Sequence, residues 1–249
     1  MLRLKNPHTV LATIEKRPAA VKSIEIQSGR QKTSWQEVID RAAECGIPVT
    51  NQMSAQPQRR RGQRTERSGG NSAQVEAPSP VPLAGLLNHS DRVNGLWLAL
   101  DTVQDPQNLG ALFRLAGFFG VHGIVMTRDK SAPITETVCD VSAGGIEHVA
   151  FAQVPNLAQA IKTVQKAGIW VVGNCERSVT SIWDVPRDRQ WMLVVGNEGD
   201  GLRRLTREKC DQLCSLPPGG PVSSLNVATA AAACLTVLST PAQAQDADN

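Results

Sequence analysis

The chain of 249 residues is poor in aromatic side chains: Phe and Trp make up 4% of it, and there is no Tyr. Proteins that bind single-stranded nucleic acid by stacking its bases need several exposed rings, so the composition disfavours that class. The six cysteines form no Cys-x-x-Cys pair and the four histidines lie far apart, so we expect no structural metal. This cysteine usage is typical of reduced thiols in an intracellular protein, which predicts a cytoplasmic location.

Signals for secretion and membrane insertion are missing as well. Arg3 and Lys5 are not followed by an apolar stretch, so no signal peptide is expected. The stretch 215–245 has no charged residue, but its prolines leave an apolar helix shorter than the roughly 20 residues that a bilayer requires. We therefore expect no membrane partner. Neither G-x-G-x-x-G nor G-x-x-x-x-G-K-[ST] occurs, which argues against the common dinucleotide and nucleoside-triphosphate cradles.

Charge is present but unevenly distributed. Residues 1–75 carry 13 Lys and Arg against 6 Asp and Glu, a net +7, whereas residues 76–249 carry 13 against 17, a net −4. Residues 53–82 are rich in Gln, Arg, Ser, Gly and Pro, which predicts a linker. We favour an arm that contacts the phosphates of a polyanion over a merely solvated linker. Its basic residues are Arg59, Arg60, Arg61, Arg64 and Arg67.

Hydrophobic periodicity predicts two α/β units. Residues 1–52 indicate a small module with helices near residues 10–14 and 38–42 and strands at 24–26 and 47–49. From residue 96 onward strands and helices alternate, which predicts a mostly parallel sheet covered on both faces. The expected strands are 96–100, 123–126, 148–154, 169–173, 191–196 and 213–216, and the expected helices are 108–119, 134–141, 157–167, 202–209 and 224–238. Such sheets bind ligands beyond the carboxyl ends of their strands.

The stretch from Asp105 to Gly120, DPQNLGALFRLAGFFG, predicts a strand-to-helix junction with Asn108 as the helix N-cap and Gly120 just past its end. Arg114 is the only formally charged residue between positions 106 and 127. A guanidinium on a helix that looks buried needs either a carboxylate partner or a ligand in a cleft, and both interpretations stay open. Glu198 is the candidate partner.

Two further segments place glycines and polar amides after strands. They are Gly196-Asn197-Glu198-Gly199-Asp200-Gly201 and the segment from Leu216 to Asn226, LPPGGPVSSLN. Flexible backbone of this kind can present main-chain donors and acceptors to a flat ligand such as adenine. Either loop alone would be interpreted as a plain turn.

Together the three segments resemble the three motifs of the SpoU (TrmH) family of RNA ribose 2′-O-methyltransferases, within the SPOUT superfamily. The motifs are 108–114, 193–201 and 216–227, in order and at the family's spacing. Sequence at 121–150 and 203–210 is most similar to the branch that methylates a guanosine of large-subunit (23S) rRNA. The front module resembles that branch's substrate-binding domain, although Lys5 replaces a common Gly and a common His-Gln-Gly is absent around 71–74. In the third motif, Pro218 replaces a common Met.

The resemblance implies an α/β fold with a C-terminal trefoil knot, a homodimer, and S-adenosylmethionine as cofactor. It assigns cofactor binding to Gly196, Leu216 and Leu225, and catalysis to Arg114 with Asn108, Glu198, Ser224 and Asn226. Because a guanidinium stays protonated, we expect Arg114 to stabilise the developing alkoxide rather than to act as general base. Implied domains are a small RNA substrate-binding unit at 1–52, a catalytic unit at 83–241 and a disordered tail at 242–249. The alternatives are a tRNA 2′-O-methyltransferase and an inactive RNA-binding assembly factor.

Overall fold

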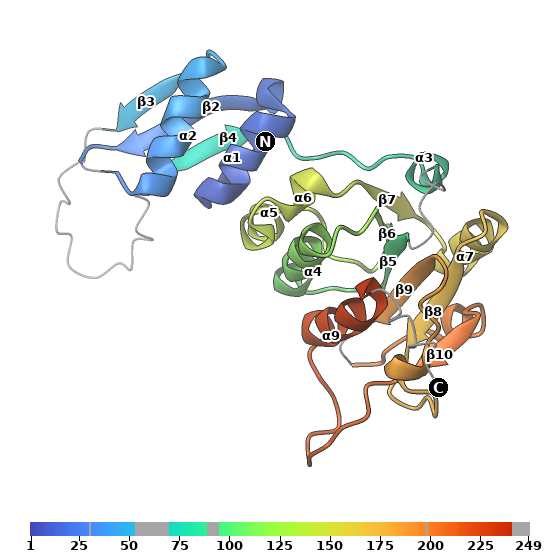
Figure 1. Ribbon diagram of the computed structural model, residues 1–249. Helices are drawn as coiled ribbons and strands as arrows, with labels where there is room; N and C mark the ends of the chain where they lie inside the picture. Colours follow the sequence, from blue (N-terminus) through green and yellow to red (C-terminus); the bar gives the residue numbers. More distant parts are fainter. Residues whose placement is uncertain (30, 53–69, 89–94, 198, 241–249) are drawn as a thin grey trace, which may run out of the picture.

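The computed structural model describes residues 1–29, 31–52, 70–88, 95–197 and 199–240. Two sheets organise these residues: a four-stranded sheet near the N-terminus and a six-stranded sheet that contains the rest of the strands (Figure 1). The predicted arginine arm, Glu198 and the tail lie outside the described residues.

The N-terminal module, residues 1–52 with 70–76, is a four-stranded sheet in the order β1-β4-β2-β3. Strands β2 and β3 are parallel, whereas β4 runs antiparallel to β1 and β2. Asn6 begins α1 by accepting a hydrogen bond from the backbone N–H of His8, and a proline follows it at the first helical position. The elements are β1 (Leu2–Leu4), α1 (Pro7–Lys16), η1 (Pro18–Ala20), β2 (Val21–Gln27), α2 (Thr33–Glu44), β3 (Val49–Gln52) and β4 (Ser72–Val75).

Strand β4 differs from the sequence prediction, because it lies inside the range 53–82 that was expected to be a linker. Ser72, Ala73 and Val75 are buried, and β4 pairs with a neighbour on each side. Two of these side chains are small, so the strand lacks the run of large apolar residues that identifies buried strands. The strand predicted at 47–49 is also displaced, to Val49–Gln52.

The six-stranded sheet is entirely parallel, in the order β10-β8-β9-β5-β6-β7. This confirms the predicted α/β class with a mostly parallel sheet. Its strands are β5 (Leu96–Asp101), β6 (Ile124–Thr127), β7 (Phe151–Val154), β8 (Trp170–Asn174), β9 (Trp191–Gly196) and β10 (Gln212–Cys214), and its helices are α3 (Leu83–Leu87), α4 (Pro106–Phe118), α5 (Glu136–Ser142), α6 (Gly145–His148), α7 (Leu157–Lys166), η2 (Ile182–Asp184), α8 (Arg204–Arg207) and α9 (Val227–Ser239).

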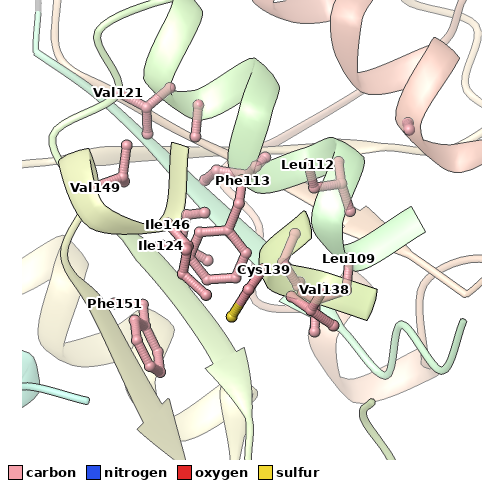
Figure 2. Close-up of a cluster of buried hydrophobic side chains, with 14 of the residues drawn as sticks. Leu109, Leu112, Phe113, Val121, Ile124, Val138, Cys139, Ile146, Val149 and Phe151 are labelled. Atoms are coloured by element: carbon pink, nitrogen blue, oxygen red, sulfur yellow. The ribbon is translucent and has the colours of Figure 1, made fainter. Parts of the chain in front are cut away.

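Both faces of this sheet are covered. Along β5, Leu98 and Leu100 contribute to the core beneath α4 and α9, whereas Trp97 and Ala99 contribute to the core on the side of α3 and α7. Figure 2 shows the first core around Phe113, whose ring meets Phe151 edge-on with centroids 5.6 Å apart. Alternation along a strand buried on both faces explains why β5 is apolar throughout.

The sequence did not predict helix α6 (Gly145–His148). Its last residue, His148, is the first residue of the strand predicted at 148–154, and the observed strand β7 begins at Phe151. The helix has four residues and begins after Gly144, which has a φ of +94°. A helix this short shows no hydrophobic periodicity. Gly145 packs directly on α4, because a Cβ there would lie within 2.5 Å of the carbonyl oxygen of Phe113.

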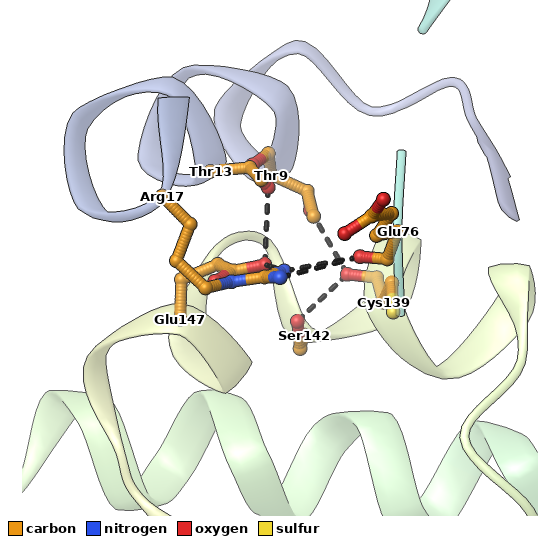
Figure 3. Close-up of polar contacts among 7 residues, drawn as sticks. All are labelled: Thr9, Thr13, Arg17, Glu76, Cys139, Ser142 and Glu147. Atoms are coloured by element: carbon orange, nitrogen blue, oxygen red, sulfur yellow. Dashed lines mark hydrogen bonds and ion pairs between the residues drawn. The ribbon is translucent and has the colours of Figure 1, made fainter. Parts of the chain in front are cut away.

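The junction between the two sheets is a set of specific contacts between α1 and helices α5 and α6 (Figures 1 and 3). Glu147, whose side chain is 3% exposed, accepts two hydrogen bonds from the Arg17 guanidinium at 2.7 Å each and one from Thr13. The hydrogen bond to Glu147 raises the pKa of Arg17. Asp140 accepts the backbone N–H groups of Lys5 and Asn6 at 2.9–3.1 Å. The module is therefore docked rather than merely tethered.

Candidate active site

The candidate site lies where the strand order reverses. From β5 the chain moves to β6 and β7 on one side, and later strands fill the other side, so β5 and β9 are neighbours at the switch. Their carboxyl ends meet, with Asp101 of β5 opposite Gly196 of β9. Crevices for ligands form at this point in parallel sheets. The first two motifs follow these two strand ends.

Asn108 is not the N-cap of α4. Asp105 is, because its carboxylate accepts a hydrogen bond from the backbone N–H of Gln107, and Pro106 takes the first helical position. The prediction was wrong because both residues are good caps and Asp105 precedes the proline. Asn108 lies in the first turn of α4, and its Oδ1 accepts a hydrogen bond from Nδ2 of Asn226 at 2.8 Å.

Asn226 therefore connects the first and third motifs. Its Oδ1 accepts from the backbone N–H of Ala228 at 2.9 Å and so caps α9, while its Nδ2 donates to Asn108. One amide side chain thus fixes the beginning of α9 against the beginning of α4 across 118 positions of sequence. The two residues that the resemblance placed in one site are in direct contact.

Arg114 lies on the same helix as Asn108 and is exposed, contrary to the expectation of a buried helix face. It lines a shallow hollow between α4, α5 and α9, together with Val141, Ala228 and Thr229. Among the described residues, no carboxylate lies within 4.0 Å of its guanidinium. Its predicted partner, Glu198, falls outside them. Both interpretations therefore stay open, and the position at the rim of a hollow leaves the guanidinium accessible to a ligand.

The second motif forms a tight turn on the end of β9. Asn197 and Gly201 exchange backbone hydrogen bonds at 3.2 and 3.0 Å, and the Asn197 side chain donates to the carbonyl oxygen of Thr102 beyond β5. Gly196 cannot carry a side chain, because a Cβ would collide with the carbonyl group of Gly201. The close approach of two backbone segments therefore requires glycine at 196.

Asp101 supports this turn and was missed by sequence reasoning. Its fully buried carboxylate accepts from the backbone N–H of Arg203 at 3.0 Å and from the Arg203 guanidinium at 2.6 and 2.7 Å. Thr102, the next residue, has a φ of +64°, an uncommon conformation for a β-branched side chain. A carboxylate directly after an apolar strand was the available signal.

Two adjoining cavities open beside this turn. The smaller, of about 220 Å³, is lined by Gly196 and other residues of the turn. The larger, of about 440 Å³, is lined by Leu216, Ser224 and the segment between them. Leu225 and Ala230 line both cavities. The three residues assigned to cofactor binding therefore line two cavities that share part of their walls.

Sequence reasoning also missed three lining residues. Asn174 and Glu176 line both cavities, and Trp183, 58% exposed, lines the larger one. Asn174 is the last residue of β8, so its place at a strand end was the signal. Ser224 lies in the wall of the larger cavity; within the described chain it makes no hydrogen bond to Asn108, Arg114 or Asn226.

The smaller cavity is lined by charges of both signs, with Glu176 and Asp200 on one hand and Arg177 and Arg207 on the other. Such a lining suits a ligand that itself carries both charges. No group of three metal-ligating side chains occurs among the residues that the structure covers. In that same part of the chain, no helix has the length and apolar character to span a bilayer.

This architecture defines a class: an α/β protein with a candidate ligand site at the switch point of a parallel sheet. Residues 95–236 match the SpoU rRNA Methylase family, and the chain belongs to that family. The 23S rRNA (guanosine-2'-O-)-methyltransferase RlmB of Pseudomonas aeruginosa is 39% identical over 240 residues, 92% of either chain. The corresponding enzyme of Vibrio parahaemolyticus is 36% identical over 235 residues, again 92% of either chain.

Solved structures agree on the fold. The SpoU methyltransferase AviRb from Streptomyces viridochromogenes is similar with a TM-score of 0.76 and 22% identity, covering 96% of this chain and 88% of that one. The same enzyme in complex with AdoMet has a TM-score of 0.73 with 23% identity, covering 95% and 88%. At these identities the likeness concerns the fold.

Proposed function

We propose that the protein transfers a methyl group from S-adenosylmethionine to the ribose 2′-hydroxyl of a guanosine in 23S rRNA. The relatives at 36–39% identity carry this activity in their names. The observation that carries the proposal is the hydrogen bond between Asn226 and Asn108, which joins the first and third motifs beside the paired cavities. Two residues 118 positions apart are thereby held at one edge of the sheet.

The cavities fit the proposed cofactor. The larger one, at about 440 Å³, is within the usual range for small-molecule sites and is lined mostly by apolar residues that suit an adenosine. The charges of both signs around the smaller one suit the zwitterionic methionine end. Gly196, Leu216 and Leu225 would hold the cofactor, in large part through backbone groups. When bound, it supplies an electrophilic methyl group on a sulfonium.

The residues of the chain would then prepare the nucleophile. A ribose hydroxyl is weakly nucleophilic and must be positioned while negative charge develops on its oxygen. Arg114, exposed at the rim, stabilises that charge and the adjoining phosphate, and the proton leaves by another route. Asn108 and Asn226 hold Arg114's helix against α9, Ser224 orients the substrate, and Glu198 orients the guanidinium.

The trefoil knot and the homodimer belong to this proposal. In such a knot the C-terminal part of the catalytic unit would be threaded through a loop of the same unit. Helix α4 supports a dimer, because Phe118 is 81% exposed one turn beyond Arg114 and a large exposed ring costs free energy unless a partner covers it. A second copy on this surface would enclose Arg114.

The N-terminal module and Arg59, Arg60, Arg61, Arg64 and Arg67 would grip the RNA through its phosphates, in a cytoplasmic protein. The module here comprises residues 1–52 together with β4. The catalytic unit begins near α3, and the tail at 242–249 has no assigned role.

The decisive experiment maps 2′-O-methyl groups in ribosomal and transfer RNA from a strain that lacks the gene. Loss of one guanosine methyl group in 23S rRNA, restored by the wild-type gene, is expected. Loss of a tRNA methyl group would identify a tRNA enzyme instead. An unchanged map, with no AdoMet binding by calorimetry, would indicate an RNA-binding assembly factor.

A further inference from the structure

The N-terminal module contains a cavity that shares no lining residue with the candidate active site. It has a volume of about 470 Å³ and lies between the start of the chain, the segment from β2 to α2, and the residues just before β4. Its wall includes Lys5, Lys32, Gln27, Gln31, Asn71 and Trp35.

The charge of this cavity is positive. Two lysines line it, and no Asp or Glu does so among the described residues. Neither Lys5 nor Lys32 forms an ion pair within that part of the chain. Asp140, which accepts the backbone N–H groups of Lys5 and Asn6, also interacts electrostatically with Lys5. The cavity is therefore suited to an anionic ligand.

The wall also offers a preorganised set of amides. Asn71 accepts from the backbone N–H of Gln27 at 2.9 Å and donates to the Gln31 side chain at 2.6 Å. These bonds use one of the two Nδ2 hydrogens of Asn71. The Gln27 side chain is exposed and makes no hydrogen bond to the rest of the described chain. Amide donors and acceptors of this kind read the edges of nucleobases.

Trp35 adds a flat apolar surface. Trp35 is 7% exposed and belongs to the core of the module, and it also lines the cavity. A phosphate ion would gain nothing from an indole, whereas a nucleobase gains from contact with an aromatic ring. Cations, amides and an aromatic wall together match a nucleotide rather than an isolated anion.

The cavity is fixed relative to Arg114. Lys5, at its rim, donates its backbone N–H to Asp140 of α5. Helix α5 in turn packs tightly on α4, because a Cβ on Gly110 would lie 2.7 Å from Cβ of Val141. The chain of contacts from the cavity to the Arg114 helix therefore consists of one hydrogen-bonded step and one close-packed step.

From these contacts we infer that the cavity binds a nucleotide of the substrate RNA other than the one that is methylated. Lys5 and Lys32 contact its phosphates, and Gln27 and Asn71 contact its base. The inference rests on the proposed function, since it requires an RNA substrate. Its role is to hold the RNA at a second point, at a set position from the reacting hydroxyl.

The test compares two double variants of the full chain, Lys5→Gln/Lys32→Gln at the cavity and Lys162→Gln/Lys166→Gln on α7, where both lysines are exposed and form no ion pair within the described chain. Both remove two positive charges. The probe is a 23S rRNA transcript, and its affinity is measured over a series of KCl concentrations. The cavity variant should lose about tenfold in affinity, and its salt slope should fall by about 2, since each lysine neutralises about one phosphate. AdoMet affinity and kcat at saturating RNA should not change.

Equal affinity for the two double variants would overturn the inference. Gln27→Ala separates a nucleotide from bare phosphate, because it should weaken binding about threefold without altering the salt slope; full affinity in this variant would rule out the base contact. The binding comparison decides the role of the cavity whether or not methyl transfer is observed. Absence of methyl transfer by the wild-type protein on 23S rRNA would instead overturn the proposed function.

Discussion

The domain junction and the candidate active site each contain an arginine, and the two arginines differ in their partners. At the junction, Arg17 makes two hydrogen bonds to the buried carboxylate of Glu147. At the active-site edge, Arg114 stands exposed on α4 with no carboxylate within 4.0 Å among the described residues. A satisfied pair holds a structure, whereas an open guanidinium remains available to a ligand that brings its own negative charge. Under the proposed function, Arg17 is the structural cation and Arg114 the functional one.

The largest expected effect is on Arg114. Arg114→Ala should abolish methyl transfer, a loss of at least about 1000-fold for an electrostatic stabiliser, and should leave the Kd for AdoMet within about twofold. Single-turnover assays and calorimetry measure the two quantities. If AdoMet binding collapsed together with turnover, Arg114 would be structural, and its contrast with Arg17 would disappear.

The turn at 196–201 contains two glycines whose substitution by alanine should have different effects. Gly196→Ala should lower the free energy of unfolding by about 3 kcal/mol, because the added Cβ would collide with the carbonyl group of Gly201. The same collision should distort the turn and remove AdoMet binding. Gly199→Ala is the control, since the nearest atom to its Cβ lies 3.9 Å away. Denaturant unfolding and calorimetry report both properties. Similar behaviour of the two variants would mean that the turn adapts and that its close contact is not essential.

A substitution at the domain junction should change the stability of the protein and leave methyl transfer and cofactor binding unaffected. Glu147→Ala leaves Arg17 and Thr13 without their acceptor, and we expect a loss of about 2–3 kcal/mol. Because the Arg17 side chain is 31% exposed, water can partly replace the carboxylate, which keeps the loss below the upper range for buried pairs. The Kd for AdoMet should stay unchanged. The exposed pair Arg204–Glu208 provides a control, where Glu208→Ala should cost less than about 1 kcal/mol.

The smallest effect concerns thiols, one in each region. Burial raises the pKa of Cys139, at the junction, and of Cys210, behind the glycine turn, to about 12. At pH 8 the thiolate fraction of either is therefore on the order of 0.0001, and alkylation is slow. Iodoacetamide followed by mass spectrometry should label the exposed Cys45 first. Early labelling of Cys210 but not Cys139 would show that local unfolding exposes the region behind the 196–201 turn more often than it exposes the domain junction.

Much of the architecture was predictable because its signals are local. Strand β9 was predicted at 191–196, its observed bounds, because a fully buried strand is a continuous apolar run ended by glycine. Gly120, with a φ of +65°, follows α4 as expected. Helix α6 and strand β4 escaped prediction, because the first is too short for periodicity and the second is made largely of small residues held in place by neighbouring strands.

The sequence indicated several residues of the candidate site, but it could not predict the contacts between them. Three motifs indicated Asn108 and Asn226, yet the hydrogen bond between them depends on how α4 and α9 pack. The choice of Asp105 as N-cap turned on the position of one proline. Trp183 and Asp101 come from segments without a motif, so only the three-dimensional structure places them at this edge.

The position of β4 shows that the arginine-rich stretch at 53–69 lies, in sequence, between two strands of the same sheet. Strand β2 is paired with β3 on one side and with β4 on the other, so the stretch leaves and re-enters the same sheet at points about 10 Å apart, two strand spacings. The described residues on either side of it therefore belong to one module, which places the stretch within that module in sequence and not between the module and the catalytic unit. A protease cut inside the stretch should leave two fragments that still co-purify, and shortening it should not detach the module from its docking helices.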